Sequence, residues 1–199
     1  LVVSDGAIDS VEALATGVSA ADVLNNGLLA GMAVIGERFR LREIFLPDVL
    51  LAAKAMYAGL DVLRPRLADE NVPPRAKIVI GSVRGDLHDI GKNLVGIMLK
   101  GAGFDVIDLG HDVPAETFVE TAIASGATVV GMSALLTTTM PRMKDVVDLL
   151  RAREPSGRIR TIVGGAPVTA EFARTIGADG WAFDAGSAVA RVTALLEAG

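Results

Sequence analysis

Short apolar segments alternate with longer segments of helical spacing from residue 77 to the end of the chain. Nearly unbroken runs of Val and Ile are typical of strands buried on both faces, as in a parallel sheet covered by helices. The alternation therefore predicts an α/β domain with a flavodoxin- or Rossmann-like, doubly wound, five-stranded parallel sheet. The predicted strands are KIVIGSV, FDVIDLG, ATVVGMSA, IRTIVGG and DGWAFD, which begin at Lys77, Phe104, Ala127, Ile159 and Asp179.

The segment before this alternation shows helical spacing alone and predicts a small helical bundle. Ser19 is a suitable N-cap for one continuous helix over 19–39. Pro47 fits the first turn of a second long helix, where its missing N–H costs nothing. A shorter helix over 7–17 precedes them, and we expect 1–3 to be the remainder of a truncated first helix.

A polar segment with three prolines, RPRLADENVPPRAK at 64–77, separates these two patterns and is typical of a linker. We therefore expect a helical cap domain at 1–70, a linker at 71–76 and a ligand-binding α/β domain at 77–199.

Composition excludes several classes of function. The formal net charge of −5 argues against a nucleic-acid partner, which would require clustered Lys and Arg. No apolar run approaches the roughly 18 residues that a membrane-spanning helix needs, and no signal peptide is visible, so we expect no membrane contact. The chain contains no cysteine, which rules out disulfides and thiolate metal ligands within it. These features predict a cytoplasmic protein.

The segment GDLHDIGKN at 85–93 follows the first predicted strand, and it admits three interpretations. Asp86 could simply cap the next helix. Gly81, Gly85 and Gly91 could form a phosphate cradle, but their spacing matches neither the dinucleotide fingerprint nor the P-loop. Alternatively, His88 ligates a metal while Asp86 accepts the other ring N–H. One imidazole cannot hold a bare transition metal tightly, so this metal would arrive already chelated in a cofactor.

Three sequence elements resemble those of cobalamin-binding domains that use a histidine as the lower cobalt ligand. They are D-x-H-x-x-G (Asp86, His88, Gly91), S-x-L (Ser133, Leu135) and the pair Gly164-Gly165. The helical segment GMAVIGERFRLREIFLPDVLLAA is also similar to the cap of methionine synthase. The whole chain most resembles the stand-alone corrinoid proteins of methylotrophic methyltransferase systems, which consist of these two modules.

The resemblance implies specific roles for these residues. His88 would be the metal ligand, Asp86 would hold its far nitrogen, and Thr139 would complete the relay where the family often has serine. Phe39 and Leu46 would cover the methyl-bearing face of the cobalt, although both, like Trp181, could simply be core residues. The remaining implied cofactor contacts are Gly85, Leu87, Asp89, Ile90, Gly91, Ser133, Leu135, Thr137, Gly164, Gly165, Trp181 and Ala185.

The family further implies a methyl carrier that is not catalytic alone and cycles between methyl-Co(III) and Co(I). A substrate-specific methyltransferase would load it, with methylcobalamin or a related methyl-corrinoid as the loaded form. A second methyltransferase would unload it onto tetrahydrofolate or a thiol coenzyme, and a reductive activase would restore it. The methyl donor stays open.

Three rival functions also share parts of the pattern. A cobalamin-dependent light sensor normally carries Trp and His in its bundle, and residues 1–75 contain neither. The cobalamin subunit of a carbon-skeleton mutase normally lacks the cap with Phe and Leu. A receiver-like regulatory domain would leave the three elements unexplained.

Overall fold

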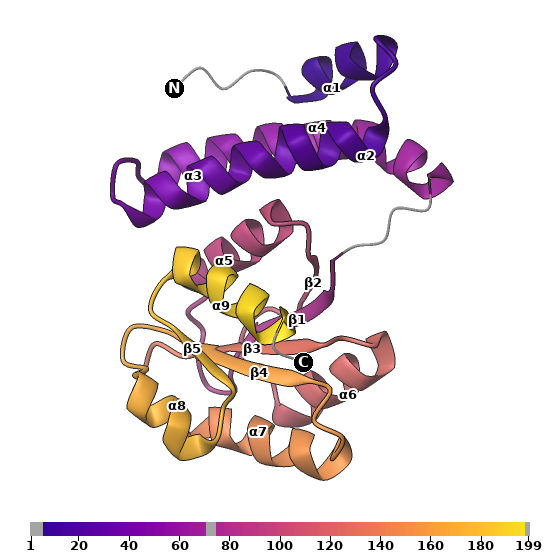
Figure 1. Ribbon diagram of the computed structural model, residues 1–199. Coiled ribbons are helices and arrows are strands. Elements are labelled where there is room, and N and C mark those ends of the chain that lie inside the picture. Colours follow the sequence, from indigo (N-terminus) through magenta and orange to yellow (C-terminus); the bar gives the residue numbers. More distant parts are fainter. Residues whose placement is uncertain (1–5, 71–74, 198–199) are drawn as a thin grey trace. The chain divides into compact units, whose positions relative to one another are not determined.

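The computed structural model describes residues 6–70 and 75–197. The predicted helical remainder at 1–3 and most of the linker at 71–76 lie outside these residues. The chain divides into two compact units, a helical one that comprises Leu1–Pro74 with Gly101–Gly103 and one built on a sheet that comprises Arg75–Lys100 and Phe104–Gly199. Figure 1 shows the elements of both units. No helix among the described residues has both the length and the apolar character needed to cross a bilayer.

The helical unit contains the expected short first helix and a less regular second one than the sequence predicts. Ser19 caps this second segment as expected, since its hydroxyl accepts the N–H of Asp22 at 3.0 Å. The helix predicted over 19–39 is confirmed, since residues 20–40 are helical without a break, but its middle is a π-helical stretch between two α-helical parts. The elements are α1 (Gly6–Ala15), α2 (Ala20–Asp22), the π-helix η1 (Val23–Leu29), α3 (Ala30–Arg40) and α4 (Leu46–Asp69).

Helix α4 begins at Leu46 with Pro47 in its first turn, as expected. It continues to Asp69, into the polar segment 64–77 that the sequence indicated as a linker. Pro65 lies inside this helix, so the prediction of a linker beginning at residue 64 was wrong. Leu63 is fully buried in a cluster with Ala20 and Val23, and Leu67 packs against that cluster. Burial of these side chains stabilises the last turns despite the proline.

The second unit confirms the predicted α/β fold. Its five strands are all parallel, in the order β2-β1-β3-β4-β5. Strand β2 lies next to β1 on one side, and β3, β4 and β5 follow one another on the other side. The strand order therefore reverses between β1 and β3, and the gap between their carboxyl ends is the topological switch point. The strands are β1 (Lys77–Ser82), β2 (Asp105–Asp108), β3 (Val129–Ser133), β4 (Arg160–Gly164) and β5 (Gly180–Ala182).

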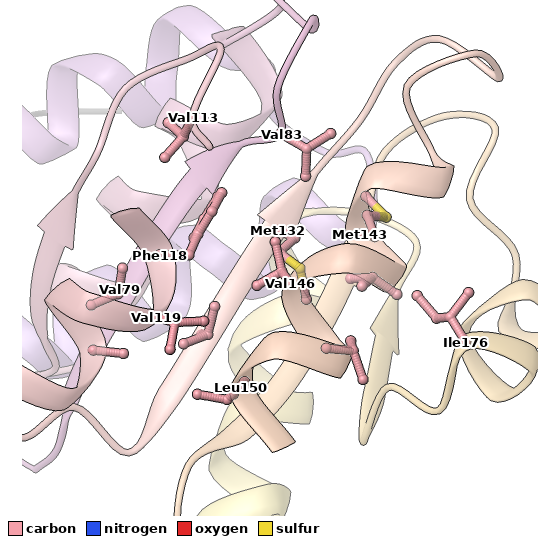
Figure 2. Close-up of a cluster of buried hydrophobic side chains, with 14 of the residues drawn as sticks. Val79, Val83, Val113, Phe118, Val119, Met132, Met143, Val146, Leu150 and Ile176 are labelled. Atoms are coloured by element: carbon pink, nitrogen blue, oxygen red, sulfur yellow. The ribbon is translucent and has the colours of Figure 1, made fainter. Parts of the chain in front are cut away.

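Five helices cover the two faces of this sheet (Figure 1). They are α5 (Ile90–Gly101), α6 (Ala115–Ser125), α7 (Pro141–Arg153), α8 (Ala170–Ile176) and α9 (Ala185–Glu197). Helices α6, α7 and α8 lie on one face, and α5 and α9 on the other. Figure 2 shows the core on the first face, where Phe118 and Met143 pack against strand residues such as Val79 and Met132. This packing fixes the strand ends from which the polar site extends.

Candidate functional site

The loops that follow β1 and β3 meet at the switch point around one buried carboxylate, that of Asp86. Its Oδ2 accepts the N–H groups of Leu135 and Leu136 at 2.7 and 3.2 Å and the hydroxyl of Thr139 at 2.7 Å. Its Oδ1 accepts the backbone N–H of His88 at 3.1 Å and lies 2.8 Å from His88 Nδ1. The structure thus brings together the predicted trio of Asp86, His88 and Thr139.

The electrostatics of Asp86 define what this trio can do. Complete burial of the side chain raises the pKa of the carboxyl, but hydrogen bonds from Thr139, Leu135 and His88 outweigh that effect. The pKa of Asp86 therefore lies well below its usual range, and the group stays ionised at any physiological pH. Asp86 is therefore a fixed negative charge that accepts hydrogen bonds from both His88 and Thr139.

His88 offers one nitrogen for ligation. Because Nδ1–H donates to Asp86, the lone pair of the neutral ring is on Nε2. The side chain is half exposed, although its carboxylate partner is not exposed at all. Among residues 6–70 and 75–197, no cluster of three or more His, Asp or Glu side chains could hold a metal ion. A single imidazole backed by a carboxylate suits a metal whose other ligands come from a chelating cofactor.

Two residues that sequence reasoning did not assign also hold the turn around His88. The hydroxyl of Ser82, at the end of β1, donates to the carbonyl oxygen of His88 at 2.6 Å. Asp112 accepts the N–H of Gly85 at 2.6 Å and donates its own N–H to the carbonyl of Asp86 at 3.0 Å. Asp112 adopts a φ of 55°, which few residues other than glycine adopt. The one available sequence signal was its position directly after the second predicted strand.

The double glycine at the end of β4 packs closely against neighbouring backbone. Gly165 has a φ of 125°, and a Cβ there would lie 1.9 Å from the carbonyl oxygen of Ala134. A Cβ on Gly164 would lie 3.1 Å from the carbonyl oxygen of Ala182. Ser133, at the end of β3, pairs with Gly164 in the sheet. The S-x-L and glycine elements are therefore neighbours at the same sheet edge as Asp86, and the glycines allow the chain to pass close to the backbone of Ala134 and Ala182.

Large apolar side chains are exposed at this edge. Each is between 42% and 73% exposed, and they follow the carboxyl ends of three different strands. Grouped apolar exposure of this kind marks a binding surface. They are Leu87, Ile90, Leu135, Leu136 and Phe183, of which the sequence prediction contained the first three. Thr137 is exposed in the turn after β3, Asp89 is half-buried, and Gly91 lies in the first turn of α5.

Four predicted contact residues have environments that also fit structural roles. Trp181 packs partly against the core and donates its Nε1–H to the carbonyl of Val168 at 2.8 Å. Ala185 begins α9 and is buried. Phe39 and Leu46 belong to the helical unit, at the end of α3 and the start of α4, and both are half-buried.

Known families and proteins resemble both units. The family described as the B12 binding domain matches residues 76–193, and a second family of the same description matches residues 5–64. A corrinoid protein of Desulfitobacterium hafniense is 44% identical over 84% of this chain and 79% of its own length. Trimethylamine corrinoid protein 1 of Methanosarcina mazei is 43% identical over 94% of this chain and 88% of its own.

Solved structures agree with this assignment. A crystallised cobalamin-binding protein from Desulfitobacterium hafniense has a TM-score of 0.77 and 34% identity, over 94% of this chain and 90% of that chain. The methanol:cobalamin methyltransferase complex of Methanosarcina barkeri contains a chain with a TM-score of 0.77 and 31% identity, over 89% of this chain and 67% of that chain. These matches confirm the predicted family, fold and cofactor: this chain belongs to the B12-binding corrinoid proteins.

Proposed function

We propose that this corrinoid protein carries a methyl group between a substrate-specific methyltransferase and a second methyltransferase, with His88 as the lower axial ligand of cobalt. The second enzyme would pass the methyl group to tetrahydrofolate or a thiol coenzyme. The observation that carries this proposal is the half-exposed imidazole of His88 on the buried carboxylate of Asp86. Bound cobalamin supplies a cobalt that accepts and releases a methyl group as its oxidation state changes.

The described residues support an oriented, neutral ligand. His88 would ligate as neutral imidazole, with Asp86 orienting the ring and strengthening its donation through Nδ1–H. Thr139 holds the carboxylate in place through its hydroxyl. Because Asp86 stays ionised, it would keep the ring in this orientation whether or not Nε2 is ligated.

The names of similar proteins suggest which methyl donors to test first. The printed names of similar proteins refer to trimethylamine and dimethylamine, and one structural neighbour is a methanol-specific complex. We propose a methylamine or methanol methyltransferase as the first partner and a reductive activase as an auxiliary one, all in the cytoplasm. Phe39 and Leu46 in the cap (1–70) would shield the methyl group.

Replacement of His88 tests the ligand role, and the chain offers a matched control in its other histidine. Purified full-length protein is titrated with methylcobalamin, and the visible spectrum is recorded. His88→Ala is expected to bind at least about tenfold more weakly and to lose the histidine-on spectrum. His111→Ala, at an exposed position, is expected to match the original chain. A histidine-on spectrum that survives in His88→Ala would refute the assignment.

Carrier function is tested separately from ligation. Protein that binds unmethylated cobalamin is reduced to the Co(I) state with a chemical reductant and mixed with a trimethylamine- or methanol-specific methyltransferase and its substrate, and methylation of the cofactor is followed by absorbance. Substrate-dependent remethylation is the expected result. A loaded, histidine-on protein that no such enzyme methylates, but whose state changes on illumination alone, would instead support the sensor interpretation.

A further inference from the structure

Lys92 is a buried ammonium group that the proposed function leaves unused. It lies in the first turn of α5, four residues after His88, and only 4% of it is exposed. Its Nζ lies 2.6 Å from each carboxylate oxygen of Asp108 and 2.6 Å from Oδ1 of Asn93. The three N–H donors of the ammonium group thus match three acceptor contacts, as burial of such a charge requires.

The partner of Lys92 belongs to the strand end that also holds the turn around His88. Asp108 is the last residue of β2, and its Oδ1 accepts the N–H of Gly110 at 2.8 Å. The carbonyl of Gly110 accepts the N–H of Ser82 at 2.9 Å. The hydroxyl of Ser82 in turn donates to the carbonyl of His88 at 2.6 Å. The backbone of His88 is therefore held between Ser82 on one side and the first turn of α5 on the other.

We propose that Lys92 is a positioning residue for His88. By holding the first turn of α5 against the end of β2, Lys92 fixes the position of the imidazole. This inference rests on the proposed ligand role of His88. Lys92 acts on the backbone that follows the ligand, whereas Asp86 acts on the imidazole ring. Without the ion pair, the first turn of α5 loses the contact between Lys92 and Asp108 at the end of β2. The backbone next to His88 is then held less firmly, and the imidazole ring would lose its fixed position relative to a bound cobalt.

Lys92→Met is the direct test, because methionine keeps an apolar stem of similar length and removes the charge. The Asp108 side chain left behind is 35% exposed and can be hydrated, so the fold should persist. Lys100→Met is the matched control, as Lys100 lies exposed in the last turn of the same helix. Asp108→Asn is a second variant that weakens the same ion pair from its accessible side.

Each full-length variant is loaded with methylcobalamin, and two quantities are measured at pH 7: the dissociation constant and the histidine-on fraction from the visible spectrum. Thermal unfolding of the apoprotein is recorded in parallel. Lys92→Met is expected to lower the ratio of histidine-on to histidine-off forms about tenfold. Asp108→Asn should lower it as well, because it leaves the buried Lys92 without its counter-charge, and Lys100→Met should not change it.

An unchanged ratio in Lys92→Met and Asp108→Asn would overturn the proposal even if the unfolding temperature fell, since Lys92 would then be purely structural. If the unsubstituted protein and His88→Ala gave the same spectrum with methylcobalamin, the ligand role of His88 would be refuted, and this inference with it. The two failures are distinguishable because the second is visible before any lysine is changed.

Discussion

The edge of the sheet around Asp86 and the interior of the helical unit are built in opposite ways. At the sheet edge, five donors converge on one buried carboxylate, and each has a fixed direction. In the helical unit, residues of α1, η1, α3 and α4 line a largely apolar cavity of about 580 Å³ that is open to solvent. The hydroxyl of Ser10 lines that cavity, and among the described residues it has no hydrogen-bond partner.

The difference indicates which part of the molecule depends on precise atomic positions. A directional polar network fails when one member is moved, because the others stay buried without partners. Apolar packing around a cavity is non-directional and tolerates rearrangement. The sheet edge should therefore set how the cofactor is held, and the helical unit should contribute contacts that can adapt. Four variants, the last of them a double substitution, test this contrast from the largest expected effect to the smallest.

Gly165→Ala should have the largest effect. The new Cβ would collide with the carbonyl oxygen of Ala134, and the φ of 125° is closed to alanine. We expect a loss of about 3 kcal/mol or more in the free energy of unfolding, and no detectable corrinoid binding. Gly157→Ala is the control, because that glycine also has a positive φ but open space around its Cα, and it should cost about 1 kcal/mol. Urea unfolding and methylcobalamin titration measure both. Equal costs would show that the sheet edge is more adaptable than its geometry indicates.

Asp86→Asn should destabilise the apoprotein by about 3 kcal/mol at neutral pH, because an amide cannot accept from all five donors. The pKa of Asp86 is lower in the folded chain than in the unfolded one. Its stabilising contribution is therefore present above the unfolded pKa, near 4, and is lost as pH falls below it. The original chain should lose stability between about pH 5 and pH 2, and the variant should lose less. Urea unfolding across this range is the measurement, with Asp89→Asn as control. Parallel curves for the original chain and Asp86→Asn would contradict the assigned pKa.

Thr139→Val should cost less, about 1 kcal/mol, since it removes one of several donors to Asp86. The histidine-on form of the loaded protein should also lose stability slightly, because the carboxylate beside the ring is held less firmly. Thr139→Ser restores the hydroxyl and should recover the original spectrum and most of the stability. If Ser and Val gave the same result, the methyl group of Thr139 would matter and the hydroxyl would not.

The double substitution Phe39→Ala and Leu46→Ala should have the smallest effect on corrinoid affinity, less than about threefold. Its effect should appear in the photolysis of bound methylcobalamin, which we expect to be faster without these side chains. Flash photolysis and a binding titration on the same samples separate the two quantities. A large loss of affinity with unchanged photolysis would reverse the roles assigned to the two units.

The sequence allowed most of the fold to be predicted, because parallel strands buried on both faces leave a clear apolar pattern. The sequence predicted the helical unit less accurately. Leu63 and Leu67 keep α4 helical past the expected linker start through contacts with distant residues, and no local pattern marks the π-helix over 23–29. Tertiary packing decides such features, and single-residue propensities do not contain it.

For the site, the spacing of Asp86 and His88 predicted the hydrogen bond between their side chains. Leu135 and Leu136 contribute backbone N–H groups, which every residue except proline carries, so their identity gave no signal. Lys92 and Asp108 are sixteen positions apart in different elements, and a pair of that kind becomes visible only once β1 and β2 are aligned.

The sequence separation of the Asp86 contacts bears on how the protein is made. Asp86 is joined to residues 49, 50 and 53 positions later in the chain. A ribosome that has released Asp86 and His88 must therefore still deliver the whole of α5, β2, α6 and β3 before the carboxylate has its donors. Domains fold as units from the N-terminus during synthesis, so the helical unit is released first and the carboxylate gains these distant donors late. The site around His88 is complete only after Thr139 has left the ribosome.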